Sequence, residues 1–278
     1  MSKCGIISIV GQTNVGKSTL LNKLLHQELS IVTPKINTTR DIITGVKMYT
    51  QDCQMIFQDT PGFIPSDKKQ QTNIYKDIKD AIKTSDVILL LIDISQKYNQ
   101  NPIQDLILDY FYNKTILVLN KIDKIKNNCI LYEKIETYKR IASKIKNKVL
   151  LSAKNDFGIH NLEEVIYTYL PEQNFFFTKE SDIMHTKEFI ISEKIREQIL
   201  LHFSHEIPYK VSIEIENIKF TKGNIYISAI LFVKKQSQKG ILIGKNGKTL
   251  KHIGIITRKK LEEFFKKRIF LKQYVKIL

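Results

Sequence analysis

The segment Ile6-Ile-Ser-Ile-Val-Gly-Gln-Thr-Asn-Val-Gly-Lys-Ser18 decides the fold of the first half of the chain. Its β-branched run, Ile6–Val10, predicts a short buried strand, and Lys17–Leu25 has the apolar spacing of a helix. Between them, Gly11–Ser18 matches the pattern GxxxxGK[ST] in full. A strand, a glycine-containing loop and a helix in this order indicate a phosphate-binding loop rather than an ordinary strand–helix turn.

The loop has a specific physical logic. Glycines let the backbone curl so that successive N–H groups point at one anion, and the helix N-terminus adds partial positive charge. We expect Lys17 to reach the β- and γ-phosphates and the Ser18 hydroxyl to ligate Mg²⁺. The loop alone does not separate ATP from GTP. The candidate nucleotide-binding residues here are Gly11, Gln12, Thr13, Asn14, Val15, Gly16, Lys17, Ser18 and Thr19.

Outward from this loop, strand and helix patterns alternate through the first 170 residues or so. The predicted strands are 41–49 and 52–58, which form a hairpin, and the apolar runs 87–92, 115–119 and 148–151. Runs that are apolar on both faces suit a parallel sheet covered by helices. The fold class predicted for this half is therefore α/β, a P-loop domain with a mostly parallel sheet and helices on both faces.

A second polar motif follows the predicted strand 115–119, at its carboxyl end, where ligands bind in open α/β sheets. Asp123 of Asn120-Lys121-Ile-Asp123 can accept hydrogen bonds from guanine N1–H and N2–H₂, a paired donor edge that adenine lacks. Lys121 can lay its alkyl stem along the base. This motif therefore favours a guanine nucleotide. Ser152-Ala153-Lys154, after the next strand, fits a backbone contact to the guanine oxygen.

Two further segments fit the γ-phosphate and its metal ion. Asp59-Thr60-Pro61-Gly62 follows the strand ending at Gln58; Asp59 is placed to hold Mg²⁺ through water, and the Gly62 N–H to sense the γ-phosphate. In Thr38-Thr39-Arg40-Asp41, a threonine can ligate Mg²⁺ only while the γ-phosphate is present, and we favour Thr39 over Thr38. Segments of this kind are ordered by the triphosphate and released on hydrolysis. The residues expected to carry the chemistry are Lys17, Ser18, Thr39, Asp59 and Gly62.

The remainder of the chain predicts a separate α+β domain. A helix at about 188–204 precedes strands at 209–216 and 224–233; a helical stretch around 240–243, a long basic helix at 248–267 and a strand at 269–277 follow. We predict a first domain over 1–171, a linker over 172–187 and a second domain over 188–278.

The turn Gly244-Lys-Asn-Gly247 lies between the two later helices, and its flanks resemble the signature of a KH domain. In such domains a GxxG turn lets an RNA backbone approach closely, with four nucleotides clamped beside it. Lysines would meet phosphates, and the apolar run Ile241-Leu242-Ile243 would line the base groove. The candidate RNA-binding residues are Ile241, Ile243, Gly244, Lys245, Asn246, Gly247, Lys248 and Lys251.

Composition agrees with an anionic partner. The 278 residues carry a net charge of +16, of which residues 1–174 hold +5 and residues 234–278 hold +12. On charge alone, a basic run is as often a solvated helix face as a binding surface. The neighbouring GxxG turn therefore has to distinguish between the two. The three cysteines are scattered, which excludes a disulfide framework or a Cys-type zinc site and predicts a cytoplasmic protein. The longest apolar run, 87–92, is too short for a membrane span.

The motifs GQTNVGKS, NTTR, DTPG, NKID and SAK, in this order and with the C-terminal GKNG, resemble those of Era-family GTPases almost from end to end. The resemblance implies a GTP- and Mg²⁺-dependent GTPase with a type II KH domain. It also implies a monomer that binds 16S ribosomal RNA near its 3′ end and assists assembly of the small (30S) ribosomal subunit. Peripheral association with the cytoplasmic face of the inner membrane is implied as well.

One departure concerns catalysis. Ras-type GTPases carry a water-orienting glutamine after the DxxG glycine, whereas this chain has Phe63. The resemblance therefore implies slow hydrolysis driven by positioning and Mg²⁺. It also offers Asn14 as a candidate K⁺ ligand, with loop shaping as the alternative role of this residue. Two other functions stay open at this stage. One is a membrane-surface signalling GTPase that uses its basic C-terminal region on acidic lipid; the other is a nucleotide-gated RNA-binding protein with negligible turnover.

Overall fold

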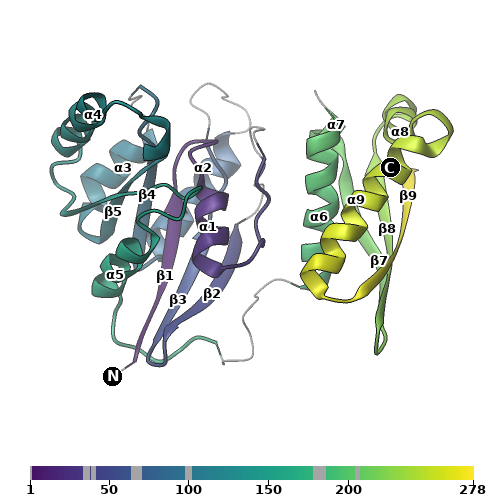
Figure 1. Cartoon of the computed structure of the whole chain (residues 1–278), viewed down its shortest axis with the longest axis horizontal. Helices are drawn as coiled ribbons and strands as arrows, with labels where there is room; N and C mark the ends of the chain where they lie inside the picture. Colours follow the sequence, from purple (N-terminus) through teal and green to yellow (C-terminus); the bar gives the residue numbers. More distant parts are fainter. Residues whose placement is uncertain are drawn as a thin grey trace. The chain divides into compact units, whose positions relative to one another are not determined.

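The computed structural model describes residues 2–33, 38, 42–63, 71–97, 102–177, 186–203 and 207–278. These residues form two compact units (Figure 1). The first comprises Met1–Ser30 and Ile36–Met184, and the second comprises Ile31–Lys35 and His185–Leu278.

The first unit is built on a twisted sheet of six strands among the described residues, in the order β2-β3-β1-β4-β5-β6. All neighbouring strands are parallel except β2, which pairs antiparallel with β3. The strands are β1 (Lys3–Val10), β2 (Ile43–Thr50), β3 (Cys53–Asp59), β4 (Val87–Asp93), β5 (Thr115–Asn120) and β6 (Asn147–Leu150).

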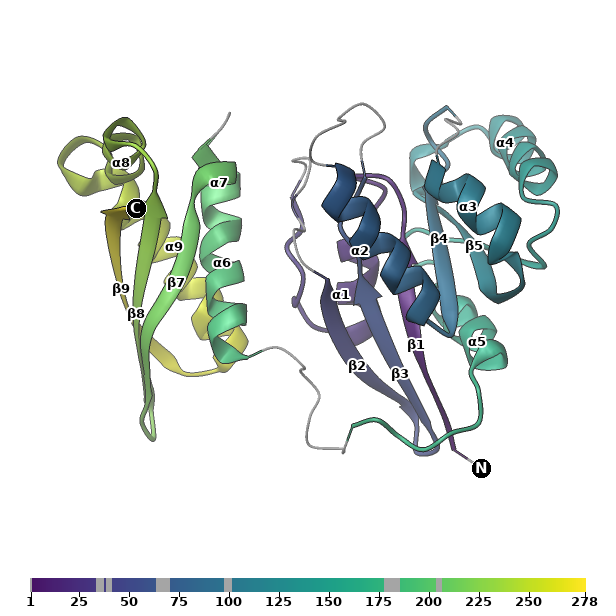
Figure 2. The same cartoon turned by 180° about the vertical axis from the view of Figure 1, so that it is seen from behind.

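Helices cover both faces of this sheet. Figures 1 and 2, which view the molecule from opposite sides, show α1 and α5 on one face of the sheet and α2 and α3 on the other. The helices are α1 (Lys17–Leu25), α2 (Gln71–Thr84), α3 (Pro102–Tyr110), α4 (Asn128–Ile141) and α5 (Ile159–Tyr169), with 3₁₀ turns at η1 (Tyr112–Lys114) and η2 (Ile122–Lys124).

The sheet core explains why these residues form strands. Every residue of β4 and β5 is buried, as expected of strands with helices on both sides. Ile78 of α2, Ile107 of α3 and Tyr138 of α4 pack into one cluster with the β4 and β5 side chains. The predicted α/β class is confirmed, with strand limits within a few residues of those expected. The carboxyl ends of β1, β3 and β5 therefore meet at one edge of the sheet, which is where the candidate loops begin.

The second unit has a three-stranded sheet, β7-β8-β9, in which β7 is antiparallel and β9 parallel to β8. Side chains of α6, α8 and α9 pack with the inward residues of the strands into one core cluster. In order, its elements are α6 (Lys187–His202), α7 (Ile207–Lys210), β7 (Ser212–Phe220), β8 (Asn224–Val233), α8 (Gln236–Ile243), η3 (Lys245–Gly247), α9 (Lys248–Phe265) and β9 (Arg268–Ile277).

The predicted α+β order is confirmed, with local differences. A helical turn at Ile207–Lys210 replaces the start of the expected strand, because proline is tolerated in the first turn of a helix. Helix α9 ends at Phe265 rather than at Lys267, since Lys266 adopts the left-handed conformation (φ 52°) that terminates helices. Among the described residues, no helix combines the length and the apolar character needed to cross a bilayer.

Candidate functional site

The phosphate loop connects the end of β1 to the start of α1. Gly16 has φ 105° and Asn14 has φ 61°, conformations that glycine adopts freely and asparagine tolerates. A Cβ on Gly11 would lie 2.5 Å from the carbonyl oxygen of Leu91, so only glycine fits there. The loop thus has the tight curl that an anion-binding nest requires.

Lys17 lies at the centre of this loop with 6% of its surface exposed. Its Nζ donates to the carbonyl oxygens of Gly11, at 3.1 Å, and Gln12, at 2.8 Å. Burial lowers the pKa of Lys17 to about 8, against the opposing attraction of Asp59. A buried ammonium held by neutral carbonyls gains from an anionic partner, and a phosphate group supplies one.

A cluster of oxygen atoms surrounds Asp59 at the end of β3. The carboxylate is fully buried, and its Oδ2 accepts hydrogen bonds from Ser18 Oγ, at 2.7 Å, and Ser30 Oγ, at 2.8 Å. Ser30 is held in turn by two hydrogen bonds with the Asn22 side chain. A carboxylate beside hydroxyls is the hard-oxygen chemistry that Mg²⁺ prefers, so Ser18 and Asp59 fit the predicted metal site.

Ser30 was missed by sequence reasoning. It lies outside every motif, and its place beside Asp59 depends on how the chain after α1 folds back. No local pattern in the sequence carries that information.

The segment that follows Asp59 lies against the phosphate loop. The Thr13 N–H donates to the Phe63 carbonyl at 3.4 Å, and Gln12 and Phe63 form an isolated parallel bridge. A Cβ on Gly62 would lie 2.8 Å from Thr13 Cα and 2.9 Å from Lys17 Nζ, so the backbone approaches the lysine closely. This proximity is what the expected role of the Gly62 N–H requires.

Two other residues of this region have structural roles. The Thr60 hydroxyl donates to the Ile9 carbonyl at 2.8 Å, and the Thr60 N–H donates to the same oxygen at 3.4 Å, so both groups fasten Thr60 to β1. Phe63 is buried in the core cluster with Val10. Its ring therefore contributes to packing, in keeping with the expectation that it cannot orient water.

The predicted switch threonine Thr39 lies outside the described residues, as do Arg40 and Asp41. Thr38 is described and is buried, at 9% exposure. The choice between Thr38 and Thr39 as a Mg²⁺ ligand stays a prediction.

The loops after β5 and β6 meet the phosphate loop through the Asn120 side chain. Its Nδ2 donates to the Val15 carbonyl at 2.8 Å, and its Oδ1 accepts from the Ala153 N–H at 3.0 Å. This amide thus fastens three separate loops together. Asp123 is oriented by the Ser152 hydroxyl, which donates to its Oδ1 at 2.6 Å. The structure brings these predicted base-binding residues together at the sheet edge that carries the phosphate loop.

Lys121 is held from two sides. Its Nζ forms an ion pair with Asp93 Oδ2 at 2.9 Å and donates to the Asn14 carbonyl. Burial raises the pKa of Asp93, but hydrogen bonds from Ser95 and Lys121 outweigh it, and the net pKa lies below its ordinary value. A charged carboxylate therefore fixes Lys121 against the phosphate loop. Asp93 was not predicted, although its position at the carboxyl end of β4 is a signal that could have identified it.

The other predicted residues lie in the same loops. Val15 is buried, Thr19 is partly buried on α1, and Pro61 is buried beside Gly62, whereas Lys154 is exposed. All of the candidate nucleotide-binding residues except Thr39 are therefore described and belong to one edge of the sheet.

The GxxG turn of the second unit forms a kinked connection between α8 and α9. Gly244 has φ 73° and ψ 176°, a region open essentially to glycine, and Asn246 and Gly247 are left-handed, with φ 54° and 74°. A Cβ on Gly244 would lie 2.1 Å from Thr249 Oγ1, whereas a Cβ on Gly247 would meet nothing within 4 Å. Gly244 thus shapes the turn, and Gly247 leaves open space above it.

Positive side chains surround this turn. Lys245, Lys248 and Lys251 are exposed, as a phosphate-contacting role requires. Ile241 is 53% exposed and Ile243 is partly buried. The expectation that Leu242 lines a base groove is wrong, because Leu242 is fully buried in the core of the unit.

A groove of about 340 Å³ runs beside the turn, between α9 and β9. It is lined by Gly247, Leu250, Lys251, Gly254, Ile255, Arg258, Leu271 and Gln273. Sequence reasoning missed the part contributed by β9, since only the fold places that strand beside α9. Gln273 Nε2 is a buried donor with no hydrogen-bond partner among the residues that the structure describes.

Two family models match the chain. The model described as "50S ribosome-binding GTPase" matches residues 6–121, and the KH-domain model matches residues 206–278. The matched segments contain the phosphate loop and the GxxG turn, respectively.

Curated relatives match over nearly the whole chain. A GTPase Era from Coxiella burnetii (strain RSA 331 / Henzerling II) is 36% identical over 276 residues, covering 99% of this chain and 92% of its own length. A GTPase Era from Thermoanaerobacter sp. (strain X514) is 37% identical over 279 residues, with 99% and 91% covered.

Solved structures of Era proteins are also similar to this chain over nearly its whole length. A variant of Aquifex aeolicus Era bound to GDP and AlF₄⁻ matches with a TM-score of 0.90 and 32% identity, covering 99% of this chain and 94% of that one. An Era structure in complex with MgGDPNP and nucleotides 1506–1542 of 16S ribosomal RNA matches with the same TM-score and identity, covering 100% and 94%.

Proposed function

From the premise that this chain belongs to the Era family of GTPases, we propose that it is a GTP-controlled RNA-binding switch of small ribosomal subunit assembly. Its KH unit would bind 16S ribosomal RNA near the 3′ end. One observation carries the proposal: within the described part of the chain, the phosphate loop is joined to the base-binding loops, and a groove lies beside the GxxG turn. The RNA of the similar Era complex spans nucleotides 1506–1542, that is 37 nucleotides.

The chain is a GTPase that uses GTP, GDP and Mg²⁺. We propose that Lys17 binds the β- and γ-phosphates, because its ammonium is buried, that burial lowers its pKa, and the hydrogen bonds it donates go to the neutral carbonyl oxygens of Gly11 and Gln12. When bound, Mg²⁺ supplies charge compensation between the phosphate oxygens. Ser18 and Asp59 are the residues that would hold it, the latter kept in place by Ser30.

Guanine selection would rest on Asp123. The Ser152 hydroxyl occupies Oδ1 of this carboxylate, which fixes the orientation of the group and leaves its other oxygen to the base. Lys121, clamped by Asp93, would lie along the ring. Asn120 acts here as a positioning residue, since both ends of its amide are engaged by protein backbone.

Hydrolysis would be slow and would depend on positioning. The Phe63 side chain has no hydrogen-bonding group, and the Phe63 carbonyl is tied to the phosphate loop by the Thr13 N–H. The proposed role of Asn14 in binding K⁺ competes with loop shaping, which its left-handed φ of 61° supports. Turnover that is unchanged when Na⁺ replaces K⁺ would leave loop shaping as the role of Asn14.

Two measurements test the proposal together. Crosslinking to total RNA in the GTP- and GDP-bound states should recover 16S 3′-end fragments, with yields that differ between the two states. Single-turnover GTP hydrolysis should be detectable with or without that RNA. Absence of 16S fragments in both states would refute the RNA assignment, and absence of hydrolysis in both would leave a nucleotide-gated RNA binder.

Three further expectations remain part of this proposal. They are the domain limits 1–171, 172–187 and 188–278, a monomeric state, and a cytoplasmic location with peripheral association at the inner membrane. The membrane contact rests on the basic C-terminal region, in which residues 234–278 carry +12. Co-flotation with acidic vesicles would test it, and flotation independent of lipid charge would count against it.

A further inference from the structure

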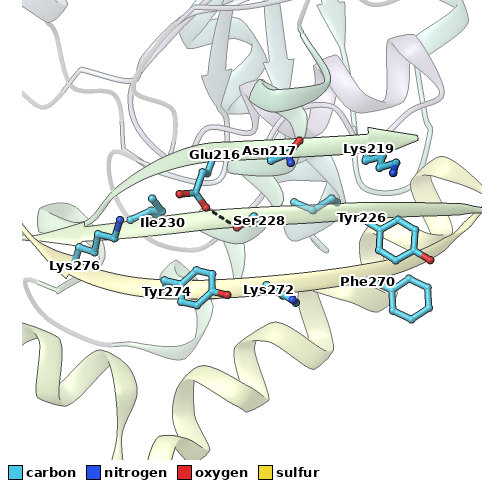
Figure 3. Close-up of a pocket in the computed structure, with 11 residues that line it drawn as sticks. Glu216, Asn217, Lys219, Tyr226, Ser228, Ile230, Phe270, Lys272, Tyr274 and Lys276 are labelled. Atoms are coloured by element: carbon cyan, nitrogen blue, oxygen red, sulfur yellow. Dashed lines mark hydrogen bonds between the residues drawn. The ribbon is translucent and has the colours of Figure 1, made fainter. Parts of the chain in front are cut away.

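The outward face of the β7-β8-β9 sheet carries a pattern unrelated to the GxxG groove. Along β9 the outward residues are Arg268, Phe270, Lys272, Tyr274 and Lys276, all exposed, so that cations and aromatic rings alternate. Residues two apart in a strand point to the same face at a spacing of roughly 6.6 Å. Figure 3 shows Phe270, Lys272, Tyr274 and Lys276 along this one strand.

The aromatic rings form a platform across the strands. Tyr226 of β8 pairs with Phe270 of β9, and their rings are stacked, with centroids 4.8 Å apart and planes at 9° (Figure 3). The Arg268 guanidinium lies 5.4 Å from the Phe270 ring centroid. Tyr226, Phe270 and Tyr274 remain 40–48% exposed. Cross-strand stacking stabilises a sheet, but exposed aromatic rings beside cations are also a feature of surfaces on which unstacked bases bind.

The charge of this face favours an anionic occupant. Its basic side chains include Lys219, Arg268, Lys272 and Lys276. They face two carboxylates of β7, Glu214 and Glu216, and the latter already accepts a hydrogen bond from Ser228 at 2.8 Å. A groove of about 580 Å³ runs over this face, and Lys219, Lys272 and Lys276 are among the residues that line it. A positively charged groove with aromatic rings is typical of surfaces that bind single strands with little sequence preference.

We propose that this sheet face is a second binding surface for single-stranded RNA, separate from the GxxG groove. It rests on the proposed RNA-binding function and extends it. A KH groove clamps about four nucleotides, whereas the RNA proposed above has 37, so most of the RNA must lie elsewhere. Strand β9 would contact RNA on both faces, since its inward residues Leu271 and Gln273 line the groove beside α9.

Two double variants separate the components of this surface. Tyr226→Val with Phe270→Val removes the stacked rings but keeps β-branched strand formers, and Lys272→Gln with Lys276→Gln removes two cations. Phe270→Tyr keeps a ring and should bind as the wild type does. Lys146→Gln is the matched control, because Lys146 is exposed and precedes the amino end of β6, away from the nucleotide loops.

Fluorescence anisotropy of the full chain should use the 37-nucleotide RNA and a short RNA of about four nucleotides, the length that a KH groove clamps. The ring variant should lose about 5- to 100-fold in affinity for the long RNA. The lysine variant should lose about 1.4 in its salt slope, at roughly 0.7 per phosphate contact. Both variants should keep their affinity for the short RNA. Lys146→Gln should keep the wild-type affinity for both RNAs and the wild-type salt slope.

Several results would overturn the inference. Unchanged affinity for the long RNA in both variants, while Gly247→Asp abolishes binding, would refute the second surface and leave the proposed function intact. An equal loss for both RNA lengths would show that the groove itself was disturbed. Loss of binding to acidic vesicles with intact RNA binding would assign the face to lipid. A wild-type protein that binds neither RNA would refute the proposed function itself.

Discussion

Replacing Asn120 with alanine tests whether one buried amide holds the nucleotide loops together. The substitution removes the hydrogen bond to the Val15 carbonyl and the one from the Ala153 N–H, 2.8 and 3.0 Å long. Asn120 is 2% exposed, so water cannot replace the amide at either group without rearrangement. Its effect should therefore appear in both the stability of the first unit and the affinity for nucleotide.

The magnitude follows from the two groups left without a partner. Each buried backbone group that loses its hydrogen bond costs about 1–3 kcal/mol. Because the surrounding loops relax in part, we expect the two groups together to cost about 2–4 kcal/mol. At about 1.4 kcal/mol per factor of ten, this equals a 30- to 1,000-fold loss of affinity if the cost falls wholly on binding. If it falls on folding, the free energy of unfolding drops by about 2–4 kcal/mol.

The assay combines urea unfolding of the nucleotide-free protein with titration of fluorescent GDP and of inosine diphosphate. Because Asn120 acts on the loops and not on the base, both nucleotides should lose affinity by the same factor. Asn155→Ala is the matched control: Asn155 is exposed and lies in the loop that contains Ala153. It should leave both readouts unchanged.

Two results would refute this reasoning. Combined losses in stability and binding below about 0.5 kcal/mol would show that the amide does not join the loops, given the cost of unpaired buried groups. A loss confined to GDP, with intact affinity for inosine diphosphate, would instead place Asn120 on the 2-amino group of guanine, which inosine lacks.

Three other predictions follow from the geometry. In the nucleotide-free protein, the free energy of unfolding should rise between about pH 8 and 10.5, because the folded state binds fewer protons than the unfolded state in that window. Lys17→Met should remove this rise. Urea titrations across this pH range would measure it, and identical pH profiles for both proteins would contradict the prediction. Gly244→Ala should destabilise the protein more than Gly247→Ala, because only the Cβ at position 244 collides with a neighbour, at 2.1 Å from Thr249 Oγ1. Thermal melts would show the difference, and equal shifts of Tm in the two variants would count against it. Asp123→Asn should lower the preference for GTP over ATP by a few kcal/mol, which is about the cost of leaving buried polar groups unpaired. Competition binding would measure this preference. Unchanged selection of GTP over ATP would refute the assignment of Asp123 to the guanine base.

The sequence predicted the nucleotide loops well because each motif is short and borders a strand. Helix α1 begins and ends where its pattern indicates, at Lys17 and Leu25. Position relative to a strand end is local information, and it was enough to place Asn120 and Asp123 at the edge that carries the phosphate loop. It did not reveal that the Asn120 amide is consumed by backbone groups, because its partners are 105 and 33 residues away.

Contacts between remote segments could not be predicted in this way. Ser30 reaches Asp59 across 29 residues, and Asp93 reaches Lys121 from a neighbouring strand. The burial of Leu242 has a similar cause: in the run Ile241–Ile243 every residue is apolar, so hydrophobicity alone cannot tell which of them faces the core. Only the helical geometry of α8 decides it.

The unbroken pairing of β8 with β9 has a consequence for how this chain can vary. The ladder runs through ten consecutive pairs, whereas the pairing of β7 with β8 contains an irregularity between Ile215 and Asn217. Inserting a single residue into β9 would move its inward side chains outward and its outward ones inward. Such an insertion would exchange core residues with the alternating cations and rings, whereas β7 already accommodates an extra residue. Length changes should therefore be tolerated at the β7 edge and excluded from β9.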